Sequence, residues 1–156
     1  IYTQPMNLVL WAPFYTKGCH AVTPPTRMVP SQSLDARIKN RSRLFYTLAE
    51  IEAKLVDPDA QSVILDIYGN VAENKGGNIF MIKDGKLITP TTANLATSDE
   101  MFITSTPYSI MPATKFNGMP IADGNVGPVT KKLIQGWSDR VGVDIIKQAQ
   151  DQLHKH

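Results

Sequence analysis

Short apolar runs separated by turn residues dominate the middle of the chain, and this pattern predicts β-strands joined into hairpins. Asp84-Gly85 and Asn117-Gly118 are two-residue turn signals that favour tight hairpins. The run at residues 7–12 reads as a further, buried strand, and the proline-rich stretch 24–30 should be extended or looped. We therefore expect strands at residues 7–12, 20–23, 62–66, 78–83, 86–89, 100–104 and 110–116.

Two stretches repeat apolar residues at helical spacing instead. The apolar stripe of the first consists of Leu44, Leu48, Ile51 and Leu55. Glu50, Glu52 and Lys54 fall on another side, which we expect to face water. The acidic and proline residues at 57–59 should end this helix.

A second helix is expected to begin at Pro128, because proline is favoured in the first turn of a helix. Its predicted buried stripe is Leu133, Ile134, Trp137 and Val141. The residues after Ile146 are polar, and we expect them to fray. Many strands with a few helices indicate an α+β domain over residues 1–146, followed by a polar tail at 147–156.

Composition narrows the possible partners. The chain has 156 residues, 42% of them hydrophobic, and a net charge of +2, which fits one globular domain. It has no basic block interleaved with aromatic residues and no long apolar run, so neither nucleic acid nor a membrane is an expected partner. The single Cys19 cannot form an internal disulfide, which favours a reducing, cytoplasmic location. The histidines lack metal-ligand spacing, and no metal site is expected.

A lysine and a glutamate carry the most informative chemistry. Lys39 precedes the first predicted helix, and Glu73 lies beyond the turn at 68–70. A primary amine that can form an imine, together with a carboxylate that can keep a pyridine nitrogen protonated, is the minimal equipment for pyridoxal 5′-phosphate (PLP) chemistry. Taken alone, each residue would be interpreted as solvated surface charge, and only the family pattern below favours a catalytic role.

Four motifs, in order, resemble the class-IV (fold-type IV) PLP-dependent aminotransferases, a family that includes branched-chain and D-amino-acid aminotransferases and aminodeoxychorismate lyase. They are residues 38–44 (IKNRSRL), 64–80 (ILDIYGNVAENKGGNIF), 98–106 (SDEMFITST) and 127–130 (GPVT). The resemblance covers about residues 21–137. It implies the strand-rich C-terminal domain of the D-amino-acid aminotransferase-like fold, with helices around the sheet.

The resemblance also implies roles for individual residues. Lys39 would form the Schiff base with PLP and, once released, carry a proton between the substrate Cα and the cofactor. Glu73 would bind the pyridine nitrogen. Arg43 would lie near the cofactor's phenolic oxygen, or be an exposed helix arginine.

The phosphate and the ring face would be contacted from two other segments. Ser105 and Thr106 match the family's phosphate-binding hydroxyl pair, although both residue types are common at strand ends. Gly76 would let the backbone approach the ring, or be an ordinary turn glycine.

The chain also departs from the family pattern. The family's smaller N-terminal domain has no counterpart, and a turn that contacts the cofactor phosphate is missing between residues 94 and 98. We therefore expect an incomplete large domain that retains PLP weakly. The implied activity is ping-pong transamination between an amino donor and a keto-acid acceptor, in a homodimer. A lyase of the aminodeoxychorismate type and a truncated, non-catalytic domain are the alternatives.

Overall fold

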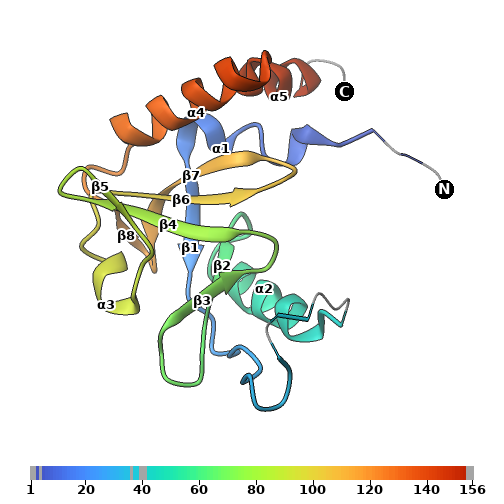
Figure 1. Cartoon of the computed structure of the whole chain (residues 1–156), viewed down its shortest axis with the longest axis vertical. Helices are drawn as coiled ribbons and strands as arrows, with labels where there is room; N and C mark the ends of the chain where they lie inside the picture. The colour runs from blue at the N-terminus through green and yellow to red at the C-terminus, as the bar shows by residue number, and fades with distance from the viewer. Residues whose placement is uncertain (1–2, 4, 36, 39–41, 154–156) are drawn as a thin grey trace.

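Most of the chain folds around a single β-sheet. The computed structural model describes residues 3, 5–35, 37–38 and 42–153. The strands are β1 (Cys19–Val22), β2 (Gln61–Leu65), β3 (Val71–Asn74), β4 (Asn78–Lys83), β5 (Lys86–Ile88), β6 (Glu100–Ser105), β7 (Ser109–Phe116) and β8 (Met119–Pro120). Within the described residues they form an eight-stranded sheet of order β3-β2-β1-β7-β6-β4-β5, and β8 pairs with β7 (Figure 1).

The central strand β1 joins two parts of the sheet. It pairs in parallel with both β2 and β7, and Ala21 lies opposite Gln61 on one side and Phe116 on the other. The remaining strand pairs are antiparallel. All four residues of β1 are buried, as expected for a strand covered on both faces.

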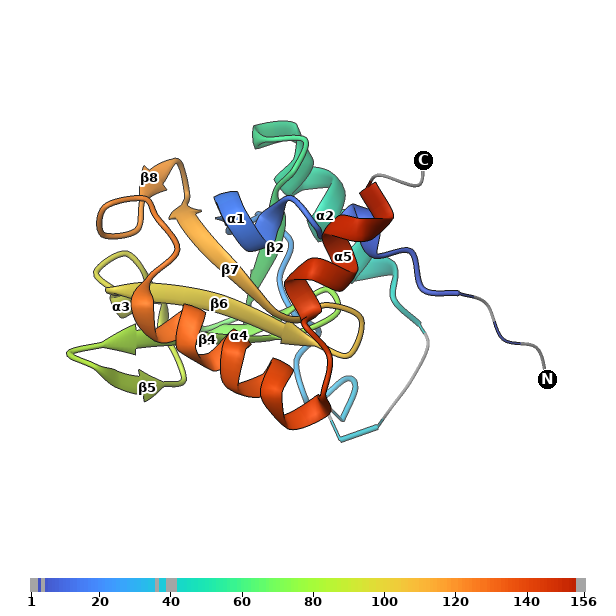
Figure 2. The same ribbon diagram turned by 90° about the horizontal axis from the view of Figure 1, so that it is seen from above.

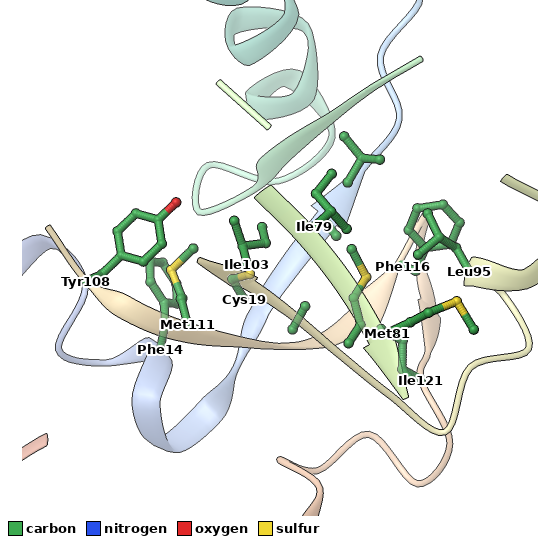
Figure 3. Close-up of a cluster of buried hydrophobic side chains, with 14 of the residues drawn as sticks. Phe14, Cys19, Ile79, Met81, Leu95, Ile103, Tyr108, Met111, Phe116 and Ile121 are labelled. Carbon is green, nitrogen blue, oxygen red and sulfur yellow. The ribbon is translucent and has the colours of Figure 1, made fainter. Parts of the chain in front are cut away.

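The sheet curls around the main hydrophobic core. β3 is at one edge of the strand order and β4 is next to the other, yet only residues 75–77 separate them in the chain. Side chains from strands across the sheet meet in one buried cluster, part of which is drawn in Figure 3. The fully buried members include Ala21, Val63, Met81, Ile103 and Met111.

Helices cover the outside of the sheet. They are η1 (Leu8–Leu10, a 3-10 helix), α1 (Phe14–Lys17), α2 (Leu44–Val56), α3 (Thr92–Leu95), α4 (Pro128–Val141) and α5 (Ile145–Leu153). Figure 2 shows α4 and α5 running along the β6–β7 side, while α2 packs on β2. A second buried cluster under α4 and α5 contains Ala12, Tyr15, Ile134, Ile145 and Ala149. The expected α+β class is confirmed.

Helix α2 presents a different face to the sheet from the one we predicted. Its buried residues are Tyr46, Ala49 and Ala53, and the two alanines allow close approach to the sheet. The predicted apolar stripe is exposed instead, with exposed fractions of 46% or more at Leu44, Leu48, Ile51 and Leu55. Helical spacing therefore identified the helix correctly but assigned the wrong face to the interior.

Three further predictions need correction. The segment predicted as a strand at 7–12 holds η1, whose first turn is capped because Val9 N–H donates to the Asn7 side chain. The predicted polar tail contains α5, and Ile145 and Ala149 fix it to the second cluster. In α4 only Ile134 of the predicted stripe is buried, while Trp137 and Val141 are more than 40% exposed.

The turn predictions are confirmed. Asp84 and Gly85 have φ of 50° and 69°, and Asn117 and Gly118 have φ of 46° and 86°. Two consecutive left-handed residues are what tight hairpins require, and asparagine, aspartate and glycine adopt them at the least cost. Among the described residues, no helix is long and apolar enough to cross a membrane.

Candidate functional site

A cavity of about 650 Å³ opens where the β3–β4 bend meets the ends of β6 and β7. Its size is typical of small-molecule sites. Five of the six residues that we predicted for the site line it, and the sixth, Lys39, lies outside the described residues. The lining residues are Arg43, Glu73, Gly76, Gly77, Asn78, Thr104, Ser105, Thr106, Ser109, Ile110 and Trp137.

Glu73 brings a carboxylate to this cavity from strand β3. Pairing of Ile64 with Glu73 fixes the position of Glu73 on the sheet. The hydroxyl of Tyr46, on helix α2, donates a 2.8 Å hydrogen bond to Glu73 Oε2. Burial, and then the hydrogen bond to Glu73, raise the pKa of Tyr46, so this phenol stays protonated as a donor. The Glu73 carboxylate is thereby held in place at the cavity wall.

Arg43 precedes the first turn of α2 and lies between the helix and the β3–β4 bend. Its guanidinium donates to the Lys75 carbonyl oxygen and lies 4.7 Å from the centre of the Tyr46 ring. Cation–π contact and the backbone hydrogen bond together hold this cation at the cavity wall. Arg43 thus adds a positive charge near Glu73, from the other side of Tyr46.

Two glycines form part of the cavity wall, for different reasons. A Cβ on Gly77 would collide with the Thr104 carbonyl oxygen and the Tyr108 hydroxyl, so the close packing of the bend on β6 requires glycine there. A Cβ on Gly76 would meet nothing within 4 Å. Gly76 therefore leaves open space at the cavity, which is compatible with a ligand lying against the backbone.

Ser105 and Thr106 lie where β6 ends, and the Ser105 hydroxyl donates to the Gly76 carbonyl oxygen. This contact joins the bend to the β6–β7 loop. Helix α1 holds this loop in place, because the buried Tyr15 hydroxyl donates a 2.7 Å hydrogen bond to the Tyr108 carbonyl oxygen. Hydroxyl groups of Ser105, Thr106 and Ser109 thus gather on one wall of the cavity.

Sequence reasoning missed several residues of this site. Tyr46 fits the apolar pattern of a helix, and no neighbouring residue in the sequence indicates that its hydroxyl donates to Glu73. Gly77 was indistinguishable from its neighbour Gly76 without the packing of β6. Trp137 was expected in the interior but lines the cavity. No group of three or more potential metal ligands occurs in the part of the chain that the structure describes.

The arrangement suits a flat, polar ligand with an acidic substituent. An oriented carboxylate can accept a hydrogen bond from a ring N–H, and hydroxyl groups can donate to phosphate-like oxygens. The open space beside Gly76 can admit a ring face.

Comparison with known proteins gives a consistent result. The sequence profile of a family described as amino-transferase class IV matches residues 5–95. A Methanocaldococcus jannaschii protein named "Putative branched-chain-amino-acid aminotransferase" is 31% identical over 153 residues, which cover 78% of this chain and 53% of that protein.

Solved structures resemble the fold. The crystal structure of the T.th. branched-chain amino acid aminotransferase has a TM-score of 0.71 at 24% identity, over 75% of this chain and 50% of that one. The same enzyme complexed with N-(5′-phosphopyridoxyl)-L-glutamate gives a TM-score of 0.70, also at 24% identity, over 74% of this chain and 50% of that one. This chain thus spans about half the length of the relatives that it matches. The likeness establishes the fold-type IV architecture of the sheet and its helices.

Proposed function

Because the chain belongs to the class-IV aminotransferase family, we propose that it supplies the large-domain half of a PLP site for transamination between an amino acid or amine and a keto acid. The observation that carries this proposal is that predicted cofactor contacts from three segments of the chain line one cavity. These residues are Arg43, Glu73, Gly76, Ser105 and Thr106. Bound PLP would supply an aldehyde for the amine and a ring that accepts electrons when the substrate Cα loses its proton.

The residues present fit this cofactor. The Glu73 carboxylate, oriented by Tyr46, can accept a hydrogen bond from the pyridine N–H. Thr106 offers a hydroxyl donor to the phosphate, and the Ser105 hydroxyl, which donates to the Gly76 carbonyl oxygen, would turn this donor to the phosphate when PLP binds. Arg43 is proposed to lie near the phenolic oxygen, which its charge would stabilise as an anion.

Lys39 is proposed as the residue that bonds covalently to PLP and moves the proton at Cα, and its assignment rests on the motif at 38–44. The amine must be partly deprotonated to do this, and Arg37, Arg41 and Arg43 provide nearby cations in the sequence that favour the neutral form. One residue would then serve both the bonding and the proton transfer.

The relatives reported above carry aminotransferase names, which favours transamination over the lyase alternative. We propose that the large domain, predicted from the sequence at residues 1–146, extends through α5 to Leu153. We also propose a homodimer, supported by the exposed apolar stripe of α2 at Leu44, Leu48, Ile51 and Leu55, which would otherwise face water. A cytoplasmic location is proposed from the single, buried Cys19.

The test adds PLP to the purified chain and follows visible absorbance, before and after a panel of amino acids. We expect PLP to bind weakly and to give an absorbance band that depends on Lys39. This band should shift when a suitable amino donor converts PLP to its amine form. Lys39→Ala should abolish the band, whereas Lys83→Ala, on the far end of β4, should leave it intact. An identical band in Lys39→Ala would refute the assignment of Lys39.

A further inference from the structure

A second cavity, of about 490 Å³, adjoins the first behind the β3–β4 bend. Arg43, Gly76 and Ser105 line both cavities, so these residues form the partition between them. None of the functional assignments above uses the second cavity, which is built from α2, the bend, the β6–β7 loop and the segment around η1.

One wall of this second cavity carries an excess of positive charge. Glu50 pairs with two lysines: its Oε1 lies 2.8 Å from Lys54 Nζ, and its Oε2 contacts Lys75 Nζ. Burial would raise the pKa of Glu50, but the two lysines outweigh this and hold the pKa below its ordinary value. Glu50 is therefore ionised at neutral pH. The charged side chains that line the cavity are the cations Arg43, Lys54 and Lys75 and the anions Glu50 and Asp59, which leaves a net charge of +1. Asp59 also pairs with Lys17.

Another part of the lining is apolar and aromatic. It includes Trp11, Phe14 and Pro107. The Trp11 ring packs against Tyr108, with 5.6 Å between ring centres. Figure 3 shows the Tyr108 ring beside Phe14 and Met111, with its hydroxyl directed away from that cluster. A ligand body placed here would bury apolar surface against aromatic rings.

Buried hydroxyl groups supply a second, independent sign of a ligand. Ser62 is 1% exposed and lines the cavity, and its Oγ has no hydrogen-bond partner among the described residues. An unpaired buried hydroxyl is costly unless something completes its hydrogen bonding. Tyr108, whose hydroxyl interacts with Ser105, also lines the cavity, and burial raises the pKa of Tyr108 to about 12, so its phenol stays protonated at neutral pH.

From this combination we propose that the second cavity is a binding site for a small organic anion with an apolar body, namely a carboxylate attached to an aromatic or branched aliphatic group. The carboxylate would lie at Lys54 and Lys75, and the apolar body would lie against Trp11 and Phe14. The site adjoins the proposed cofactor cavity but does not depend on PLP. An occupant would contact the Arg43–Gly76–Ser105 partition and thereby influence the first cavity.

The test uses the purified chain without cofactor, so its outcome is independent of the proposed transaminase activity. Isothermal titration calorimetry compares 3-phenylpropionate with its uncharged analogue 3-phenylpropionamide and with inorganic phosphate. We expect 1:1 binding of the carboxylate, and binding of the amide that is weaker by about tenfold or more, because a charge-assisted contact is lost. Equal affinity for both compounds would overturn the proposal, as would binding of phosphate in preference to the carboxylate.

Two variants should change affinity in opposite directions. Lys75→Gln removes a cation and should weaken 3-phenylpropionate binding roughly tenfold, whereas Glu50→Gln removes the anion and should strengthen it. Lys83→Gln is the matched control, because Lys83 is about as exposed as Lys75 and pairs with Asp99 elsewhere. Tighter binding by Glu50→Gln cannot result from misfolding. Unchanged affinity in both Lys75→Gln and Glu50→Gln would refute the charge assignment.

Fluorescence can locate the ligand. The chain has two tryptophans, so Trp11 is the only one left in a Trp137→Phe variant. We expect 3-phenylpropionate to change Trp11 emission along the same binding curve that calorimetry gives. A calorimetric signal without any change in Trp11 emission would place the ligand elsewhere and overturn the proposal.

Discussion

The Tyr46 hydroxyl donates a 2.8 Å hydrogen bond to the Glu73 carboxylate, and this contact links helix α2 to strand β3 at the cavity. Because Tyr46 is 8% exposed, its ring is fixed by packing, and the carboxylate is fixed in turn. Orientation of a charged group by a buried neighbour is a common way to prepare a site for its ligand.

Replacing Tyr46 by phenylalanine should therefore weaken PLP binding without unfolding the chain. A hydrogen bond to a charged group contributes about 1.5 kcal/mol, so we expect roughly tenfold weaker binding in an absorbance titration. Tyr68→Phe is the control, since Tyr68 is 77% exposed at the β2–β3 turn. Equal PLP affinity in the two variants would contradict a role for Tyr46.

Replacing two glycines at helix α4 by alanine should change the stability of the fold in opposite directions. A Cβ on Gly127 would collide with the buried Glu100 side chain, whose carboxylate accepts hydrogen bonds from Val129 N–H and Thr130 N–H. Gly136 lies within the helix with open space around it. We expect Gly127→Ala to lower the thermal midpoint and Gly136→Ala to raise the free energy of unfolding by up to about 1 kcal/mol. Loss of stability in Gly136→Ala alone would contradict the packing of α4.

The orientation of α2 can be tested in the same way. Ala49 is fully buried, so Ala49→Leu should overpack the interface with β2 and cost about 1–3 kcal/mol. Leu55 is 83% exposed, and Leu55→Asn should change monomer stability by less than about 0.5 kcal/mol. Urea unfolding distinguishes the two outcomes, and the reverse order would restore the face predicted from the sequence. If the stripe is a dimer interface, Leu55→Asn should also shift the chain towards monomer in light scattering.

Asp57 should make stability depend on pH in the acid range. Asp57 is the residue at which α2 ends. Its carboxylate accepts a hydrogen bond from the Asp59 N–H and pairs with His20 at 2.9 Å. The Asp59 N–H and then His20 lower the pKa of Asp57 below its ordinary value of 3.8. A lowered pKa in the folded state means that Asp57 stabilises the fold above pH 3.8, and that this stabilisation is lost as pH falls further.

The measurement is the urea midpoint between pH 2.5 and 6. Asp57→Asn should flatten its decline at the acid end, whereas Asp151→Asn, on the exposed side of α5, should follow the parent curve. A parent-like slope in Asp57→Asn would show that this carboxylate does not contribute.

The hairpins were predictable because turn chemistry is local. Asp84-Gly85 and Asn117-Gly118 determine their own backbone angles whatever surrounds them. The buried face of α2 was not predictable in this way. The small residues Ala49 and Ala53 let the helix approach β2 closely, and side-chain hydrophobicity gives them little weight against four leucine and isoleucine residues. The segment around η1 is apolar because it packs under α5, and its periodicity could not reveal a 3-10 helix.

Much of the candidate site could be inferred from motif order. Arg43, Glu73, Gly76, Ser105 and Thr106 come from three separated segments, and the fold brings them around one cavity. The contributions of Tyr46 and Gly77 depend on how α2 and β6 pack against the bend, which is tertiary information. Lys39 lies outside the described residues, so its place in the site stays a prediction.

The parallel pairing of β1 with β7 has a consequence for biogenesis. Residues 19–21 pair with residues 113–116, so the sheet cannot close until residues 113–116 have left the ribosome. Pairings this distant raise contact order and slow folding. Until then one of the two edges of β1, which pair with β2 and β7, lacks its partner β7. The cavity draws its lining from residues as far apart as Arg43 and Trp137, so it too can be completed only after these distant parts of the chain have come together.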